Sequence, residues 1–384
     1  MRAGRLVSIV ITNYNYCRFL AEAIDSALGQ TWPHTEVIVV DDGSADNSRD
    51  VIAAYGDRVV PVLKANGGMA SSQNAGFAVS RGDVVLFQDS DDMLLPTAVE
   101  GAVQLFADPK VVRVQWPMWE VDRYGWRTGR LIPGRVLPEG ELRDRLLREG
   151  PDACIGPPTS GNAWSRAFLS QVLPIPEAEF RQHSDMYLIT LAALHGTLRA
   201  VPGPQGCYRV HGANDYACRP GDEKNRRNLE MYDRRCLLLA DHLRRLGLEA
   251  DPARWKEGAG YTWMRRRHVA TETIKALVPE GDTFILVDED QWADPGGWGP
   301  VITGRRALPF LERDGRYWGR PPDSATAILE LERMRQAGAG SVVFVWPAFW
   351  WLDHYAGLHA HLRERLPCVL RNDDLVIFDL RQYP

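Results

Sequence analysis

The sequence predicts an α/β fold built on a parallel sheet, with a second, smaller α/β domain after it. Short, continuous apolar runs rich in Val and Ile occur at residues 7–11, 37–40 and 84–87. Such runs are typical of strands that are buried on both faces of a parallel sheet. Segments with helical spacing separate them, and this alternation predicts parallel pairing with right-handed crossovers. A similar alternation begins at residue 283 and predicts the second domain.

The elements of the first half-sheet follow one another at short spacing. A helical pattern over residues 18–28 follows the first strand, and Gly29 ends it. After the strand at 37–40, Asp41-Asp42-Gly43-Ser44 supplies a turn and a helix N-cap. The next predicted elements are a helix over 48–55, a strand over 59–63, a helix over 71–79 and the central strand over 83–87.

The pattern changes beyond Pro96, where the aromatic-rich segment 116–126 predicts a hairpin or a loop. The expected elements here are a helix to about residue 106, a strand over 111–115, a helix over 184–194 and a strand over 198–201. Charged helical sequence then predicts a connector between two bodies. The predicted domains are a Rossmann-like α/β domain over 1–220, a helical connector over 221–277 and a small Rossmann-like, doubly wound domain over 278–384.

The small domain begins with a strand over 284–287 and continues with a helix over 324–336, capped by Asp323, and a strand over 342–345. A helix over 355–366 and a hairpin over 368–380 complete it. It contains neither a GxGxxG nor a P-loop signature, so we assign no cofactor to it. We expect its aromatic cluster to pack in the core or at an interdomain contact: Trp346, Phe349, Trp350, Trp351 and His354.

Composition narrows the class of protein. A chain of 384 residues with net charge -5 gives no reason to expect a nucleic-acid partner, and the Arg265–Arg267 triplet is interpreted as a solvated helix face. We expect scattered reduced thiols and a cytoplasmic location, because no CxxC pair occurs among the cysteines at positions 17, 154, 207, 218, 236 and 368. Neither a signal peptide nor a transmembrane segment is predicted, and peripheral membrane contact stays open.

Three carboxylates within four residues follow the central predicted strand: Asp89, Asp91 and Asp92. Carboxylates packed this densely repel one another unless a cation sits among them, and a hard divalent ion with oxygen ligands is the usual answer. The carboxyl ends of strands are also where open α/β sheets bind ligands. We therefore predict a metal–diphosphate site here; the alternative is a strand end with an acidic turn.

Four ordered segments together resemble family 2 glycosyltransferases, over roughly residues 5 to 215. They are residues 7–15, residues 39–44, Asp89-Ser90-Asp91-Asp92 and Tyr208-Arg209-Val210-His211-Gly212. Four motifs in this order are far more specific than a lone acidic triplet. The resemblance implies a GT-A fold, a nucleotide-diphosphate-sugar donor, a divalent cation (Mn²⁺ or Mg²⁺) and inversion at the anomeric carbon.

The resemblance also implies roles for the donor and metal residues. Asp89, Asp91 and Asp92 are metal and diphosphate residues, and Asp91 is favoured as the direct ligand. Nucleoside contacts are implied at Thr12, Tyr14 and Asp42, with Asp41 beside them, and an aromatic face, a hydroxyl and carboxylates suit a base and a ribose. The alternative for Asp41 and Asp42 is turn and capping chemistry.

Residues 66–76 resemble the glycine-bearing loop and the following helix of the family. The arginine that often precedes the asparagine is replaced by Gln73 here, which leaves Lys64, or an arginine from elsewhere, to supply a cation near the diphosphate. Asn74 is a donor-binding candidate, although we favour a role in bracing the helix.

An inverting transfer needs a base that takes the proton from the acceptor. By resemblance this base is Asp185, at the start of a helix, although Ser184 stands where the family often has Glu. The alternative is that Asp185 only favours the helix N-terminus through the macrodipole. The resemblance brings His211 to the metal or the diphosphate, where an imidazole favours Mn²⁺ over Mg²⁺; the alternative is a packed or solvated histidine.

The acceptor side is open in the sequence. Trp116, Trp119, Tyr124 and Trp126 are candidates either to stack on a sugar ring or to cover the sheet. By resemblance, residues 157–162 lie near the acceptor, with Thr159 and Asn162 as hydrogen-bond donors. A glycan, a lipid, a peptide or a small molecule all remain candidate acceptors.

The predicted function is a metal-dependent, inverting glycosyltransferase with Asp185 as general base. One alternative is a non-catalytic nucleotide-sugar-binding or scaffold protein, which the intact acidic residues argue against. A sugar nucleotidyltransferase is a weaker alternative, because residues 12–15 lack the glycine-rich triphosphate loop that such an enzyme needs.

Overall fold

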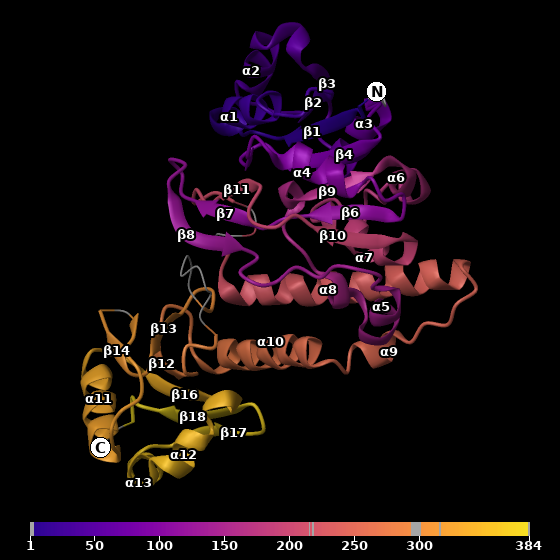
Figure 1. Cartoon of the computed structure of the whole chain (residues 1–384). Coiled ribbons are helices and arrows are strands. Elements are labelled where there is room, and N and C mark those ends of the chain that lie inside the picture. The colour runs from indigo at the N-terminus through magenta and orange to yellow at the C-terminus, as the bar shows by residue number, and fades with distance from the viewer. Residues whose placement is uncertain (1–3, 215, 217–218, 293–300, 315, 383–384) are drawn as a thin grey trace. The chain divides into compact units, whose positions relative to one another are not determined.

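The computed structural model describes residues 4–214, 216, 219–292, 301–314 and 316–382 (Figure 1). The chain divides into two compact units. The N-terminal unit comprises residues 1–211 and 232–256, and the C-terminal unit comprises residues 212–231 and 257–384. The predicted domain boundaries at residues 220 and 277 stay a prediction.

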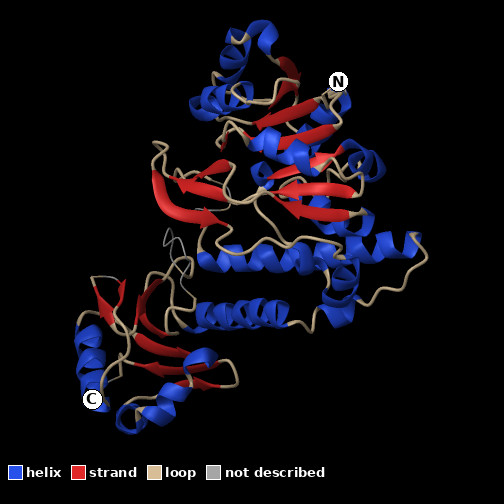
Figure 2. Cartoon of the chain, in the orientation of Figure 1, coloured by secondary structure: helices blue, strands red, loops and turns tan. Residues whose placement is uncertain are grey.

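The N-terminal unit is built on a seven-stranded sheet with the order β10-β6-β9-β4-β1-β2-β3. Its first four strands pair in parallel, as the alternation of elements predicts. These strands are β1 (Val7–Asn13), β2 (Thr35–Asp42), β3 (Val60–Lys64) and β4 (Val84–Asp89). The other strands are β6 (Val111–Gln115), β9 (Asn162–Ser165) and β10 (Thr197–Ala200). Figure 2 shows the strands in red with helices flanking them.

Strand β9 is a feature that the sequence analysis missed. It lies between β4 and β6 and runs antiparallel to both. Its four residues are fewer than periodicity can separate from a loop, and the polar Asn162 and Ser165 at its ends hide the apolar pair between them. The mixed sheet thus carries one antiparallel strand within a parallel core.

Helices cover both faces of this sheet. On one face, Ile9 and Ile11 of β1 pack in a core with Leu20 and Ala23 of α1. On the other, Gly76 of α3 lies against Val10 and Val40, because its missing side chain lets the helix approach the sheet. The helices of this unit are α1 (Cys17–Leu28), α2 (Ser48–Ala54), α3 (Met69–Val79), α4 (Ala98–Leu105), α5 (Arg143–Glu149), α6 (Arg166–Val172), α7 (Ser184–His195) and α9 (Pro252–Trp255).

A second, four-stranded sheet with the order β5-β11-β7-β8 stands beside the end of β4. Its strands are β5 (Met93–Leu94), β7 (Met118–Val121), β8 (Arg127–Ile132) and β11 (Gly206–Arg209). The aromatic-rich segment 116–126, expected to be a hairpin or a loop, supplies β7 and the turn after it, and β7 pairs antiparallel with β8 directly beyond that segment. Strand β11 pairs in parallel with β7 and antiparallel with β5.

The C-terminal unit contains a mixed five-stranded sheet with the order β13-β12-β16-β18-β17. Its core elements are β12 (Thr283–Val287), β13 (Arg306–Pro309), β16 (Ser341–Val345), β17 (Cys368–Arg371), β18 (Leu375–Asp379), α10 (Ala259–Leu277), α11 (Ser324–Gln336), α12 (Trp350–His354) and α13 (Ala356–Arg365), with a small β14 (Glu312–Arg313) and β15 (Arg316–Tyr317) pair. Helices cover both faces, since α11 and α13 pack on one core and α10 on the other. The aromatic cluster expected to pack contributes Trp351, which is fully buried.

Helix α8 (Gly221–Arg245) contributes to both units. No helix of the described residues is long and apolar enough to cross a membrane. The described cysteines are all free thiols, as expected: Cys17, Cys154, Cys207, Cys236 and Cys368. The sixth, Cys218, lies outside the described residues.

Two histidines join α7 to α8 within the N-terminal unit. The Nε2 atoms of His195 and His242 are 3.2 Å apart, and His195 Nδ1 lies 3.1 Å from Gln171 Oε1. Burial lowers the pKa of both imidazoles, and each histidine also faces positive charge: His242 and Arg143 at His195, and Arg245 at His242, which Asp241 opposes.

We expect the contact between His195 and His242 to weaken in acid. An unfolded histidine has a pKa of about 6.5, so the unfolded chain binds more protons than the folded chain once the pH falls through that value. Stability contributed by the two neutral imidazoles is present above pH 6.5 and is lost toward their lower folded pKa. His242→Gln should lose less stability than the wild type between about pH 7 and 5 in urea unfolding, whereas exposed His34→Gln should match the wild type.

Replacement of Gly76 tests the packing of α3 on the sheet. A Cβ at this position would lie 2.2 Å from Val10 Cγ1 and 3.1 Å from Val40 Cγ2. Gly76→Ala should therefore lower the free energy of unfolding by about 1 to 3 kcal/mol. Gly260→Ala in α10, where a Cβ meets nothing within 4 Å, should be neutral or stabilise by up to about 1 kcal/mol. Equal effects of the two changes in urea unfolding would contradict this packing.

Candidate active site

The acidic turn that follows β4 is largely removed from water. Asp89 is half-buried and Asp92 is 1% exposed. Burial raises the pKa of Asp89 well above its usual value, and the charges of Asp91 and Asp185 raise it further. Burial likewise raises the pKa of Asp92, together with the charges of Asp91 and Asp89. Four carboxylates therefore lie close enough to repel one another: Asp89, Asp91, Asp92 and Asp185. Such repulsion is expected where a cation binds.

Strand register brings the donor candidates to the α3 face of the sheet. Thr12 lies two residues after Val10 and Asp42 two residues after Val40, and both valines face α3. Thr12 also pairs in register with Asp89. Thr12, Asp42 and Asp89 therefore stand on one face at the carboxyl ends of neighbouring strands. Tyr14 follows in the loop after β1 and is 48% exposed.

Asp42 is buried, and both of its carboxylate oxygens are occupied by the chain. Oδ1 accepts from Lys64 Nζ at 2.5 Å and from the Gly67 amide at 2.9 Å. Oδ2 accepts from Asn66 Nδ2 at 3.0 Å and from the Gly68 amide at 2.7 Å. Asp42 and Lys64 thus hold the glycine-bearing loop in place before α3 begins.

Asp41 is fully buried on the opposite face and also serves the local turn. It accepts hydrogen bonds from Asn13 Nδ2, the Ser44 amide and Arg49 Nε. Burial acts to raise its pKa, but these hydrogen bonds outweigh it and hold the pKa below the usual value. The contacts of Asp41 and Asp42 are those of the turn alternative, and their contact with a donor stays a prediction.

Asp185 stands in the first turn of α7 and is buried. Burial raises its pKa, although the charges of His183, Arg235 and Arg113 and the Met186 amide oppose the rise. Its charge also raises the pKa of Asp89, so the two carboxylates interact electrostatically. The structure thus brings the predicted base to the acidic turn although nearly a hundred residues separate them in the sequence.

His211 lies beside the acidic turn as well. Its Nε2 atom is 3.1 Å from Asp91 Oδ2, and its ring packs on Tyr16 and Phe19 with centroids 5.3 and 4.7 Å away. Within the described residues, no group of three or more His, Cys, Asp or Glu side chains is arranged to hold a metal ion. Asp91 and His211 still fit a divalent cation, because such ions often take one or two protein ligands and complete their shell with phosphates and water.

Asn74 braces α3, as we favoured. Its Oδ1 accepts from the Ile175 amide at 2.8 Å, and its Nδ2 donates to the Ile175 carbonyl at 3.0 Å. Gln73 is fully buried, and neither atom of its amide has a hydrogen-bond partner among the described residues. It therefore does not replace the missing cation of the loop.

Arg181 is a residue that the sequence analysis missed. Its Nη1 donates to the Gly67 carbonyl at 3.1 Å and its Nη2 to Asn66 Oδ1 at 2.5 Å, while its own carbonyl accepts from the Met69 amide. The exposed Arg181 guanidinium thus lies at the glycine-bearing loop, where Gln73 replaces the arginine of the family. It brings positive charge to this loop from another part of the chain. Its position just before α7 was the only available signal.

Arg209 joins the acidic turn to two other segments, the turn after β7 and helix α1. The side chain is 1% exposed; its Nε donates to the Asp91 carbonyl, its Nη1 to the Arg123 carbonyl and its Nη2 to Glu22 Oε2. The Arg209 amide donates to Asp92 Oδ1 at 3.0 Å. The conformation of the acidic turn therefore depends on Arg209. The sequence analysis gave this residue no role beyond its place in the motif at residues 208–212.

On the acceptor side, the structure separates the candidates. Trp116 is fully buried in the sheet core, so its predicted alternative role as a sugar-stacking residue is wrong. Tyr124 and Trp126 are 73% and 75% exposed. Asn162 is buried; its Nδ2 donates to the Pro158 carbonyl and its Oδ1 accepts from Arg113 Nε. Thr159 is buried, and its hydrogen bond to Asp89 lowers the pKa of that carboxyl.

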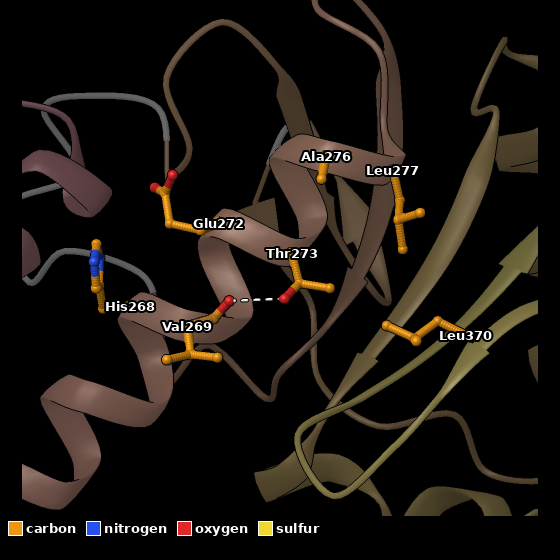
Figure 3. Close-up of a pocket in the computed structure, with 7 residues that line it drawn as sticks. All are labelled: His268, Val269, Glu272, Thr273, Ala276, Leu277 and Leu370. Atoms are coloured by element: carbon orange, nitrogen blue, oxygen red, sulfur yellow. Dashed lines mark hydrogen bonds between the residues drawn. The ribbon is translucent and has the colours of Figure 1, made fainter.

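A surface hollow in the C-terminal unit contains none of the predicted site residues (Figure 3). It is lined by His268, Val269, Glu272, Thr273, Ala276, Leu277 and Leu370. Thr273 Oγ1 donates to the Val269 carbonyl at 2.9 Å, which leaves a mostly apolar lining. We assign it no part in the chemistry.

Comparisons with known proteins agree with the resemblance seen in the sequence. The family model described as "Glycosyl transferase family 2" matches residues 8–167. An uncharacterized glycosyltransferase of Nostoc sp. is 35% identical over 254 residues, 64% of this chain and 77% of that protein. An uncharacterized glycosyltransferase of Rickettsia felis is 36% identical over 146 residues, 37% of this chain but only 24% of that protein.

Among solved structures, the chain is similar to S. aureus TarS 1-349 in complex with UDP-GlcNAc, at 17% identity and a TM-score of 0.44. The match covers 71% of this chain and 82% of that one. It is also similar to the mannosyltransferase PcManGT from Pyrobaculum calidifontis in complex with GDP-Man and Mn²⁺, at 16% identity and a TM-score of 0.44. That match covers 94% of this chain and 86% of the other.

Loss of Arg209 should destabilise the N-terminal unit. Arg209→Met leaves the Asp91 and Arg123 carbonyls without their donor, which costs about 1 to 3 kcal/mol for each carbonyl that stays buried. The matched control is Arg145→Met, whose ion pair with Glu149 has side-chain exposures of 47% and 41% and is worth less than about 1 kcal/mol. Urea unfolding measures both, and a small loss for Arg209→Met would show that the turn holds without it.

Proposed function

The chain belongs to glycosyl transferase family 2 and is a nucleotide-sugar-dependent glycosyltransferase, and we propose that it transfers the sugar with inversion, with the help of a divalent cation. The observation that carries this proposal is the convergence of Asp89, Asp91, His211 and Asp185 at the end of β4. The Asp91–His211 distance of 3.1 Å supports Asp91 and His211 as a pair of ligands. Asp92 is 1% exposed and its Oδ1 accepts from the Arg209 amide, so in this proposal it holds the turn beside the ligand pair.

The donor lies on the α3 face of the sheet in this proposal. Thr12 and Tyr14 contact the nucleoside, and Asp89 faces the diphosphate and the sugar. Asp41, Asp42, Lys64 and Asn74 contribute by holding the surrounding loops. A divalent cation, when bound, stabilises the negative charge that grows on the departing diphosphate. The imidazole of His211 favours Mn²⁺ over Mg²⁺ as that cation.

Asp185 acts as the general base. It takes the proton from the acceptor nucleophile as that nucleophile attacks the anomeric carbon opposite the leaving diphosphate, which inverts the configuration. A buried carboxylate with a raised pKa suits this role, because proton transfer is most effective when the base has a pKa close to the working pH. The charge of Asp185 raises the pKa of Asp89, which supports a position of the base beside the donor sugar.

The test is a panel of UDP-, GDP- and dTDP-sugars with Mn²⁺, with Mg²⁺ or with a chelator. We expect one donor to raise the melting temperature and to be slowly hydrolysed only when metal is present. Asp91→Asn should weaken both effects, because it removes the direct ligand. If no donor binds under any condition, the proposal fails and a scaffold function takes its place.

Asp185→Asn separates the base from the helix-terminus alternative. The variant should keep donor stabilisation but transfer the sugar about 10² to 10⁴ times more slowly. Asp144→Asn, which changes an exposed aspartate in the first turn of α5, is the matched control and should transfer normally. Transfer that survives in Asp185→Asn would assign Asp185 to the helix macrodipole.

A further inference from the structure

The turn between β7 and β8 presents two large aromatic side chains to water. Tyr124 and Trp126 are 73% and 75% exposed, whereas Trp116 and Trp164 of the same unit are at most 1% exposed. Cover by a ligand would remove this ring surface from water, which favours binding. The sequence left two roles for these aromatic residues, which were stacking on a sugar ring and covering the sheet. Tyr124 and Trp126 do not cover the sheet.

The turn is rigid without any ligand. The Asp122 carboxylate accepts from the Tyr124 and Trp126 amides, both at 2.9 Å. The Asp122 amide donates to the Trp126 carbonyl at 2.9 Å, and the Gly125 amide donates to the Asp122 carbonyl at 3.0 Å. Gly125 takes a left-handed φ of 85°, which closes the turn. These hydrogen bonds therefore fix the backbone from which the two rings project, which lowers the entropy cost of ordering the turn in a complex.

A single side chain separates this turn from the acidic site. Val121 pairs in parallel register with Arg209, and the Val210 amide donates to the Val121 carbonyl at 2.8 Å. The Arg209 guanidinium donates both to the Arg123 carbonyl in the turn and to the Asp91 carbonyl in the acidic site. Figure 1 shows β7, β8 and β11 together in one sheet. A chain molecule bound on the turn can thus extend toward Asp91.

We propose that this turn is an acceptor subsite in which Tyr124 and Trp126 stack on the rings of a saccharide acceptor. The inference rests on the proposed function and deepens it by naming the acceptor class. Flat aromatic faces with a polar edge suit the apolar C–H faces and hydroxyl rim of a sugar ring. A lipid surface is the competing occupant, because Tyr and Trp also favour membrane interfaces. Two rings on a tight turn beside the reaction centre fit a saccharide better.

The experiment uses the intact chain labelled with 5-fluorotryptophan. Fluorine NMR follows Trp126, whose signal is assigned by its loss in Trp126→Phe, while short glucose, galactose, mannose and N-acetylglucosamine oligosaccharides are added. Vesicles of equimolar phosphatidylcholine and phosphatidylglycerol form the second arm. The variants are Tyr124→Ala, Trp126→Ala and Trp126→Phe. The control is Trp318→Ala, which removes a 61% exposed ring from the C-terminal unit.

We expect at least one oligosaccharide to shift the Trp126 signal and the vesicles to leave it unchanged. Removal of each ring should raise the acceptor KM about tenfold, while Trp126→Phe and Trp318→Ala should stay close to the wild type. Donor hydrolysis without acceptor should be the same in every variant. Donor hydrolysis therefore tests the proposed function independently of the subsite. If the wild type does not hydrolyse any donor, the proposed function fails, and the subsite that rests on it fails with it.

Three results would overturn the inference while donor hydrolysis persists. The first is a Trp126 signal that no oligosaccharide shifts. The second is a signal that shifts with vesicles only, which would assign the turn to a membrane surface. The third is an acceptor KM that is unchanged in both Tyr124→Ala and Trp126→Ala.

Discussion

The repulsion among buried carboxylates at the end of β4 is the constraint on which the rest of the site depends. Asp89 and Asp92 both have a raised pKa, first through burial and then through Asp91 and a neighbouring carboxylate. The chain meets this cost only in part, with hydrogen bonds from Thr159, Ser160 and the Arg209 amide. A cation and a positively charged surround are what such a cluster demands. These carboxylates therefore lower the stability of the free protein, and a bound cation would relieve their repulsion.

Arg209 makes this strained cluster part of a larger structure. One guanidinium links the acidic turn, helix α1 and the β7–β8 turn. The strand that carries it also delivers His211 to Asp91 two residues later. The order of residues in that strand thus couples the conformation of the acidic turn to the position of the β7–β8 turn. Arg181 brings positive charge to the glycine-bearing loop before α3, where the family often has an arginine and this chain has Gln73.

Much of the fold followed from local patterns. Strands β1, β2 and β4 are continuous apolar runs buried on both faces, and their parallel pairing follows from the helices between them. Strand β9 was missed because four residues carry too little periodicity. The site was predicted as a set of motifs, and the structure brings Asp89, Asp91, His211 and Asp185 together. The roles of Arg181 and Arg209 were not predicted, because the contacts of an arginine depend on the segments that fold around it.

The sequence by itself determined the class of fold, the family resemblance and the residue types of the site, because periodicity and short motifs are local properties of the chain. Only the tertiary structure decided which atoms are free for a ligand. Asp42 reads as a donor contact in its motif, yet its carboxylate accepts hydrogen bonds from Lys64 at the end of β3 and from the loop that precedes α3. Trp116 and Trp126 read alike in sequence, but one is fully buried and the other is 75% exposed. Burial and hydrogen-bond partners depend on contacts between distant segments, and those contacts exist only once the chain has folded.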